Sequence, residues 1–166
     1  MKFIIIDPKA QQVRTLVAND LHDAKLSVNL PTNRVDHGTI RPGLAIVIYD
    51  HCLFDPAETT PYFALNRKLY GGCAIVYAYD QGGDTIDIDE RAVPRPIWLA
   101  DADAVEKAIM RGLVERPQMA VNGEVFWQWP LPMPDLAEFA RRSAEAMGKN
   151  GGAVIDGDTF ITVIKK

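Results

Sequence analysis

The sequence predicts an α+β fold, in which a mainly antiparallel sheet built from hairpins carries three or four packed helices. Short β-rich runs recur along the chain and are separated by turn signals such as Gly82-Gly83 and Asn122-Gly123. Segments with helical spacing follow aspartates that suit a helix N-cap, such as Asp20. The chain has 166 residues and is 48% hydrophobic, which is ordinary for a domain with its own core.

The N-terminal stretch is expected to form a hairpin followed by a short helix. Lys2–Ile6 is an apolar run closed by Asp7-Pro8, and Gln11–Val17 alternates between apolar and polar residues. Asp20 is placed to cap a helix that turns Leu21, Ala24 and Val28 inward.

A second hairpin is expected from Val35–Ile40 and Leu44–Tyr49. The intervening Pro42-Gly43 favours a type II turn, which is not the usual hairpin turn. If the two strands pair, Asp36 faces Tyr49 and His37 faces Ile48.

The central hairpin is the clearest structural signal. A two-residue turn at Gly82-Gly83 predicts that Tyr79 faces Ile86 and that Tyr77 faces Ile88. The tyrosines and isoleucines then share one buried face. Just upstream, Tyr62–Tyr70 has helical spacing, and Gly71-Gly72 is expected to end that helix.

The C-terminal half begins at a proline-containing connector. We expect a helix that starts at Asp101 or Asp103 and ends before Pro117, and another that starts at Asp135. Two further hairpins are expected, which pair Met119–Val121 with Glu124–Trp127 and Ala153–Ile155 with Thr159–Ile164. The predicted division is an N-terminal α+β module of residues 1–92 and a C-terminal segment of residues 93–166, packed as one compact unit.

Charge and composition exclude several classes of protein. The net charge of −4 argues against a general nucleic-acid binder, which usually shows a basic excess. No apolar run is long enough for a signal peptide or a membrane span, so we expect a cytoplasmic protein with no membrane partner. Cys52 and Cys73 do not form a CxxC pair and are expected to be reduced.

Four stretches of the first half resemble a known family. They are the opening MKFIIIDP, the strand LAIVIYD, the stretch PYFALNRKLYGG and the hairpin AIVYAYDQGGDTIDI. Over about residues 1–88 they resemble a family of small, uncharacterised domains encoded by phages, prophages and plasmids. The resemblance implies a mobile-element accessory protein in the bacterial cytoplasm, and it carries no site residues.

The leading hypothesis is a non-catalytic accessory protein that binds a host or phage macromolecule, with opposition to a host defence system as its role. Trp127 and Trp129 lie on one face of a predicted strand with Val125, and Pro130–Pro134 extends that ridge. The simpler interpretation, which we favour, is that both indoles cover the core.

Two alternatives remain open, and neither calls for a cofactor. A small-ligand binder of the phosphate or nucleotide type would use Asn66, Arg67, Tyr70 and the backbone of Gly71-Gly72. A metal-assisted hydrolase would use Asp36, His51 and Cys52, although strand alternation sets His37 and His51 apart. No phosphate-loop, dinucleotide-binding, GxSxG or HExxH motif occurs.

Overall fold

The computed structural model describes residues 1–30, 35–49, 53, 61–121, 124–132, 135, 137–138, 141, 153–155 and 159–161. The chain divides into two compact units, Met1–Glu115 and Arg116–Lys166. The predicted α+β class with mainly antiparallel sheets of hairpins is confirmed. The prediction of three or four helices is wrong, because the described residues contain only two α-helices. Neither of them is long and apolar enough to cross a membrane.

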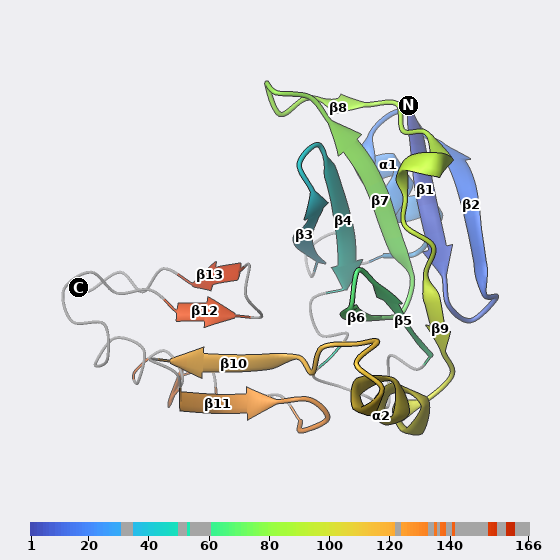
Figure 1. The fold of residues 1–166 in the computed structure, drawn as a ribbon. Helices are drawn as coiled ribbons and strands as arrows, with labels where there is room; N and C mark the ends of the chain where they lie inside the picture. Colours follow the sequence, from blue (N-terminus) through green and yellow to red (C-terminus); the bar gives the residue numbers. More distant parts are fainter. Residues whose placement is uncertain are drawn as a thin grey trace. The chain divides into compact units, whose positions relative to one another are not determined.

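A six-stranded antiparallel sheet dominates the first unit (Figure 1). The strands run in the order β2-β1-β7-β4-β3, and β8 pairs with one end of β7. Their bounds are β1 (Lys2–Asp7), β2 (Gln12–Val17), β3 (Val35–Arg41), β4 (Leu44–Tyr49), β7 (Ala74–Tyr79) and β8 (Thr85–Ile86).

Strand β7 lies at the centre of this sheet. It pairs with β1 along one edge, where Val76 is opposite Ile4, and with β4 along the other, where Val76 is opposite Ile46. Ala74, Ile75 and Val76 are fully buried. Apolar residues therefore occur on both faces of β7, as expected for an inner strand covered on both sides.

Each face of the sheet has its own core. On one face, Ile4, Ile46 and Val76 pack with Phe63 and Leu65. The last two residues come from β5 (Tyr62–Leu65), the middle strand of a three-stranded sheet completed by β6 (Lys68–Gly71) and β9 (Ile97–Leu99).

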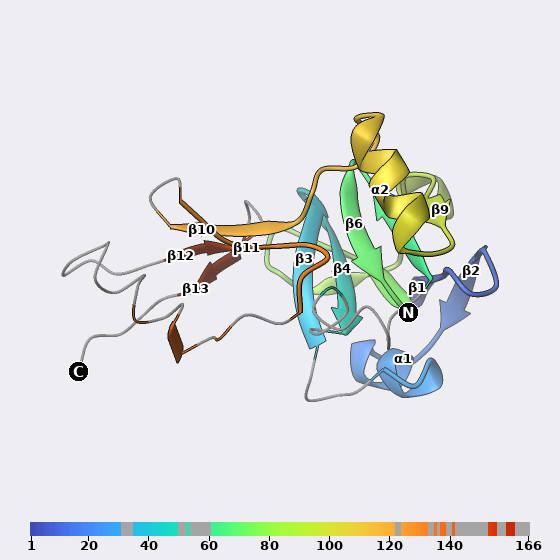
Figure 2. The same ribbon diagram turned by 90° about the horizontal axis from the view of Figure 1, so that it is seen from below.

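The other face packs against α1 (Leu21–Ser27) and the residues that follow it. Phe3, Ile5, Val47 and Ile75 meet Ala24 and Leu30 there. The carboxylate of Asp20 accepts a hydrogen bond from the Asp23 amide at 2.9 Å, so the predicted cap is confirmed. Seen from below, α1 lies on one side of the six-stranded sheet and α2 (Ala102–Met110) on the other (Figure 2).

The β1–β2 and β3–β4 hairpins form as predicted, but the predicted register of the second is wrong. Asp36 faces Ile48 and His37 faces Val47, one position away from the prediction. The ladder shifts between Thr39 and Arg41, where a β-bulge adds one residue to β3. The extra residue accommodates the Pro42-Gly43 turn and moves every partner beyond it.

The central hairpin also differs by one position from its predicted register. Ala78 faces Ile86 and Tyr79 faces Thr85. The turn extends from Asp80 to Asp84 and contains Gly83 at φ +89°. The Asp80 carboxylate accepts hydrogen bonds from the amides of Gly82 (2.9 Å) and Asp84 (3.0 Å), which stabilises this longer loop.

That register change moves the isoleucines to the other face of the sheet. Ile88 packs with Ala74 and Val76 in the core shared with β5, not on the face of Tyr77 as predicted. A shift of one residue reverses the face of every following side chain, so the physical cause is the longer turn.

The predicted helix over Tyr62–Tyr70 is wrong, because this stretch forms the β5–β6 hairpin. Asn66 and Arg67 form the turn with φ angles of +47° and +69°. Two consecutive residues with positive φ are typical of a type I′ turn, the turn that best matches strand twist. Phe63 and Leu69 therefore belong to different strands, and their helical spacing is coincidental.

The first unit extends beyond residue 92, where the sequence suggested a division. β9 pairs with β5, placing Leu99 opposite Tyr62, and α2 follows it. Asp101 is the N-cap and accepts from the Ala104 amide at 2.9 Å. The helix ends at Met110, earlier than expected, because Gly112 at φ +71° closes it.

The second unit contains a four-stranded sheet in the order β11-β10-β12-β13. Its strands are β10 (Gln118–Val121), β11 (Glu124–Gln128), β12 (Ala153–Ile155) and β13 (Thr159–Ile161), so both predicted C-terminal hairpins are confirmed. The predicted helix from Asp135 falls mostly outside the described residues. The Asp135 carboxylate does accept hydrogen bonds from the amides of Ala137 and Glu138.

The Arg67 backbone gives a stability prediction. A non-glycine residue with φ of +69° is strained, so Arg67→Gly should be more stable than Arg67→Ala by about 1 kcal/mol. Both variants lose the exposed ion pair with Glu115, whose 3.7 Å contact contributes little. Urea unfolding of the two variants measures the difference, and equal stability would contradict a strained turn.

Candidate functional site

The two tryptophans of the proposed aromatic ridge are buried. Trp127 is 5% exposed and Trp129 is fully buried, whereas Val125 is 46% exposed. The Trp127 indole donates to the carbonyl oxygens of Leu131 and Pro132, both at 3.0 Å. The ridge is thus not exposed, and both indoles lie in the interior, as the simpler interpretation holds.

A β-bulge explains why the predicted ridge does not form. Met119 faces Trp127 and Ala120 faces Val125, so β11 contains one extra residue between these pairs. Regular alternation, which would have put Val125 and Trp127 on one face, is interrupted there.

The residues of the proposed phosphate site are not brought together. Asn66 and Arg67 form the turn at one end of the β5–β6 hairpin, and Gly71 pairs with Tyr62 at the other end. The four residues of β6 span roughly 13 Å. Tyr70 is buried in the core and stacks on Phe63, with the ring centroids 5.3 Å apart.

Of the three residues proposed as metal ligands, only Asp36 can be placed. It is exposed on β3, and its carboxylate accepts from the His37 amide at 2.8 Å. His51 and Cys52 lie outside the described residues. Within the described parts of the chain, no group of three histidine, cysteine or acidic side chains is arranged to hold a metal ion.

His37 instead contacts a tyrosine. Its Nδ1 lies 3.2 Å from the Tyr77 hydroxyl, and the rings meet edge to face. Burial and the nearby Lys25 lower the pKa of His37, and Asp36 only partly offsets them. Burial also raises the pKa of Tyr77, which favours the neutral phenol. This pair therefore joins β3 to β7 as uncharged groups at neutral pH.

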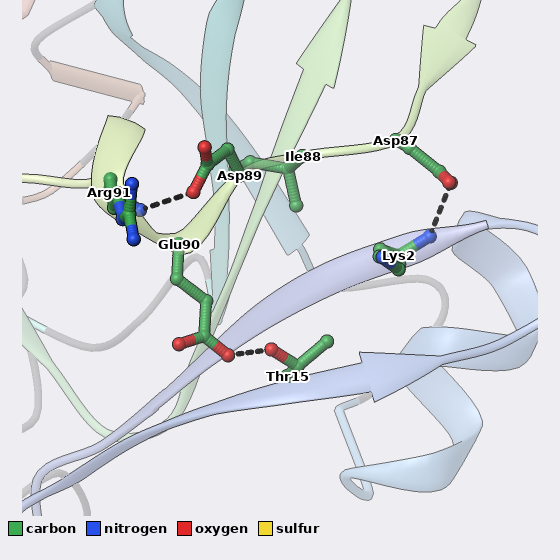
Figure 3. A pocket seen from close by; sticks show the side chains of 7 residues that line it. All are labelled: Lys2, Thr15, Asp87, Ile88, Asp89, Glu90 and Arg91. Carbon is green, nitrogen blue, oxygen red and sulfur yellow. Dashed lines mark hydrogen bonds between the residues drawn. The ribbon is translucent and has the colours of Figure 1, made fainter.

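A hollow of about 520 Å³ lies over β1 and β2, where the segment after β8 crosses the sheet (Figure 3). We call it the Glu90 hollow. It is lined by Lys2, Thr15, Asp87, Ile88, Asp89, Glu90 and Arg91.

The carboxylates of the Glu90 hollow hold the crossing segment in place. Asp87 accepts from the Lys2 amide at 2.8 Å, and Glu90 accepts from the Thr15 hydroxyl (Figure 3). Asp89 turns back and accepts from the Arg91 amide at 2.9 Å, capping the short 3₁₀ helix η1 (Glu90–Ala92). These bonds give all three acids structural roles, and the pattern lacks a paired acid and base.

A second hollow, of about 630 Å³, lies between the end of β2 and α1, and we call it the β2–α1 hollow. Its polar residues bond within the chain: the Asn19 amide donates to the Asp23 carboxylate at 2.6 Å, and the Ser27 hydroxyl donates to the Asp23 carbonyl at 2.8 Å. Val17, 72% exposed, and Leu26, 55% exposed, also line it. The hollow therefore presents apolar side chains beside polar groups that are already bonded.

Comparison of the chain with known protein families, with curated proteins and with solved structures found no match. The resemblance of residues 1–88 to domains of mobile elements therefore remains a prediction.

Sequence reasoning missed both hollows. The bond from Thr15 to Glu90 joins residues 75 positions apart and depends on the register of the central hairpin. Leu26 was an available signal, because it is an apolar residue on the face of α1 opposite to the inward Leu21 and Ala24.

The burial of Trp129 predicts a structural role. Trp129→Ala should lower the free energy of unfolding by about 3 kcal/mol or more, because a large buried side chain is lost. Val125→Ala, at an exposed position on the same segment, should change it by less than about 0.5 kcal/mol. Denaturant unfolding followed by circular dichroism compares them, and an unchanged stability of Trp129→Ala would restore the exposed-ridge hypothesis.

The Cys73 thiol should be unreactive near neutral pH. Burial, reinforced by the nearby Asp7 carboxylate, raises its pKa to about 11. Because only the thiolate reacts, alkylation at pH 8 should be roughly a hundredfold slower than for an unperturbed cysteine, and the rate should climb until the pH passes 11. Iodoacetamide labelling of a Cys52→Ser variant across pH measures this, and a rate plateau near pH 9 would contradict the shift.

Proposed function

We propose that this chain is a non-catalytic accessory protein of a phage or another mobile element, and that it binds a host macromolecule through the β2–α1 hollow. The observation that carries the proposal is the exposure of Val17 and Leu26 at one hollow. Exposed apolar side chains gathered at one place are a feature of protein interaction sites.

The chemistry of the hollow supports a protein partner. Its polar side chains are already hydrogen-bonded within the chain, so a partner can bind there without supplying hydrogen bonds to them. The exposed leucine and valine gain most from contact with an apolar side chain. The overall charge of −4 disfavours the phosphate backbone of a nucleic acid.

The structural engagement of the acids supports a non-catalytic role. Asp87 and Glu90 fix the segment that crosses the sheet, and Asp20, Asp80 and Asp101 bond to backbone amides in turns and helix caps. A general acid or base needs a carboxyl that can reach a substrate, and these groups are committed elsewhere. Opposition to a host defence system in the bacterial cytoplasm is the biological role that accords with the resemblance of residues 1–88.

Substitution of Leu26 tests the proposal. Leu26→Lys should weaken binding to the host partner by at least about tenfold, because a charge replaces an apolar contact, and it should leave folding intact at this exposed position. The matched control is Met110→Lys, at an apolar position 84% exposed on α2 and away from the hollow. Bacterial macromolecules retained on wild-type chain would be identified, purified and titrated against all three proteins by calorimetry.

The outcome separates the two interpretations. A partner that loses affinity only for Leu26→Lys supports the proposal. Equal affinity for all three proteins, or the absence of any partner that binds the purified chain, contradicts it.

A further inference from the structure

Strand β2 is the outer strand on one side of the six-stranded sheet (Figure 1), and within the described residues it pairs only with β1. The pair formed by Met1 and Ala18 shows which residues of β2 direct their backbone N–H and C=O groups towards β1 and which direct them away. The Met1 ammonium donates to the Ala18 carbonyl at 2.7 Å, and the Ala18 amide donates to the Met1 carbonyl at 3.1 Å. Met1 and Ala18 are therefore a hydrogen-bonded pair, and every second pair from there along the ladder is of the same type.

This alternation turns the backbone groups of Val13, Thr15 and Val17 towards the open edge. The register pairs Lys2 with Val17, one step from Met1 and Ala18, so this pair has no hydrogen bonds between its own members. Lys2 agrees with this assignment, because its amide points away from β2 and donates to the Asp87 carboxylate at 2.8 Å.

The open edge has a sequence that can pair with itself. The run Val13-Arg14-Thr15-Leu16-Val17 places a valine two residues on either side of Thr15. Val17 is 72% exposed and Val13 is 40% exposed. We propose that β2 pairs in antiparallel fashion with β2 of a second copy of this chain, about a two-fold axis at Thr15.

The register is determined by hydrogen-bond number and by charge. With the axis at Thr15, Val13 faces Val17 of the second copy, and Thr15 faces Thr15 of the second copy. Three pairs of residues whose backbone groups point to the open edge then exchange about six hydrogen bonds. An axis at Arg14 or at Leu16 leaves only two such pairs. The Arg14 axis also places two guanidinium groups opposite each other, which is unfavourable.

The side chains at this interface are suited to a weak, reversible contact. Cross-strand valine pairs stabilise a sheet, and each Arg14 faces Leu16 of the second copy, which its aliphatic stem can cover. Glu90 opposes pairing, since its bond to Thr15 brings the carboxylates of both copies towards the axis. One pair of edge strands is also smaller than a standard stable interface, so the dimer should form as the concentration rises.

Pairing would give the exposed edge a partner. An unprotected edge strand tends to associate with other chains, and a two-fold pair closes it and limits the assembly to two copies. This inference goes beyond the proposed function but shares one residue with it, because Val17 belongs both to β2 and to the β2–α1 hollow. Leu26 lies on α1 and takes no part in the β2 ladder, so Leu26→Lys tests the hollow without changing the β2 edge.

Two double variants test the register. In Val13→Lys/Val17→Lys, like charges would face each other twice across the axis, whereas Val13→Glu/Val17→Lys would place opposite charges there. Within one chain, position 13 faces Ile6 and position 17 faces Lys2, so the two variants share the same contact between Lys2 and the new lysine. Sedimentation or light scattering over a range of concentrations measures the mass of each protein.

The wild-type mass should rise from 18.4 kDa towards twice that value with concentration. The lysine-lysine variant should associate at least about tenfold more weakly, and the glutamate-lysine variant should retain the dimer. A wild-type chain that stays at 18.4 kDa would overturn the proposal and leave the edge for a strand of another protein. Equal association of the two double variants would also overturn it, because the contact would then lie elsewhere.

Val17→Pro provides a second test that preserves the fold. Proline removes an amide that faces the open edge, and edge strands accept proline at such positions. The variant should keep the thermal transition of the monomer and lose the dimer. If Val17→Pro dimerises as strongly as the wild-type chain, the proposed pairing is contradicted.

Discussion

The first unit depends on the enclosure of β7. This strand is paired along both edges and covered on both faces, so Ala74, Ile75 and Val76 are fully buried. Ile75 packs towards α1, and Val76 packs towards β5. Strands β1 and β4 also contribute to both cores, and β7 lies between them, so a disturbance in β7 affects the helix side and the second sheet together. Within the part of the chain that the structure describes, β2 lies at the outer edge of this sheet and pairs only with β1.

The acidic residues of this chain serve mainly its architecture. Asp7, Asp20, Asp80, Asp89 and Asp101 each accept hydrogen bonds from backbone amides at turns or helix caps. A carboxylate placed this way satisfies donors that would otherwise lack a partner, which is why aspartate is favoured at these positions. In and after the central hairpin, Asp80 stabilises the turn and Asp89 caps the 3₁₀ helix, so these two acids have structural roles.

Local signals in the sequence predicted the elements whose formation depends on local chemistry. Asp20 was predicted as a cap, and Asp101 was one of two predicted helix starts with Asp103, because a short polar side chain directly before an apolar helical pattern favours an N-cap. Both long hairpins were predicted, yet their registers were wrong by one position, because a bulge after Thr39 and a longer turn at Asp80–Asp84 are not determined by hydrophobic pattern alone. Asn66 and Arg67 show the same limit, since a strained turn resembled part of a helix.

Long-range features were beyond a single sequence. The hydrogen bond that Thr15 donates to Glu90 can be predicted only if one knows which face of the six-stranded sheet the segment after β8 covers. That face follows only from the correct register of the central hairpin. The residues proposed for a small ligand lie apart for a related reason, since a hairpin separates Arg67 from Gly71 where a helix would have kept them near each other. Trp127 and Trp129 had two interpretations from sequence, and only the burial of their indoles distinguishes between them.

Residue-level amide hydrogen exchange in β2 tests most directly the claim that the sheet of the first unit ends in an open edge there. In dilute protein, the amides of Arg14 and Leu16 should be protected by β1, whereas those of Val13, Thr15 and Val17 should exchange rapidly with solvent. At high concentration the three outward amides should become protected as well. Uniform protection of all five amides in dilute protein would contradict the account, because it would show that this edge is already covered within the single chain.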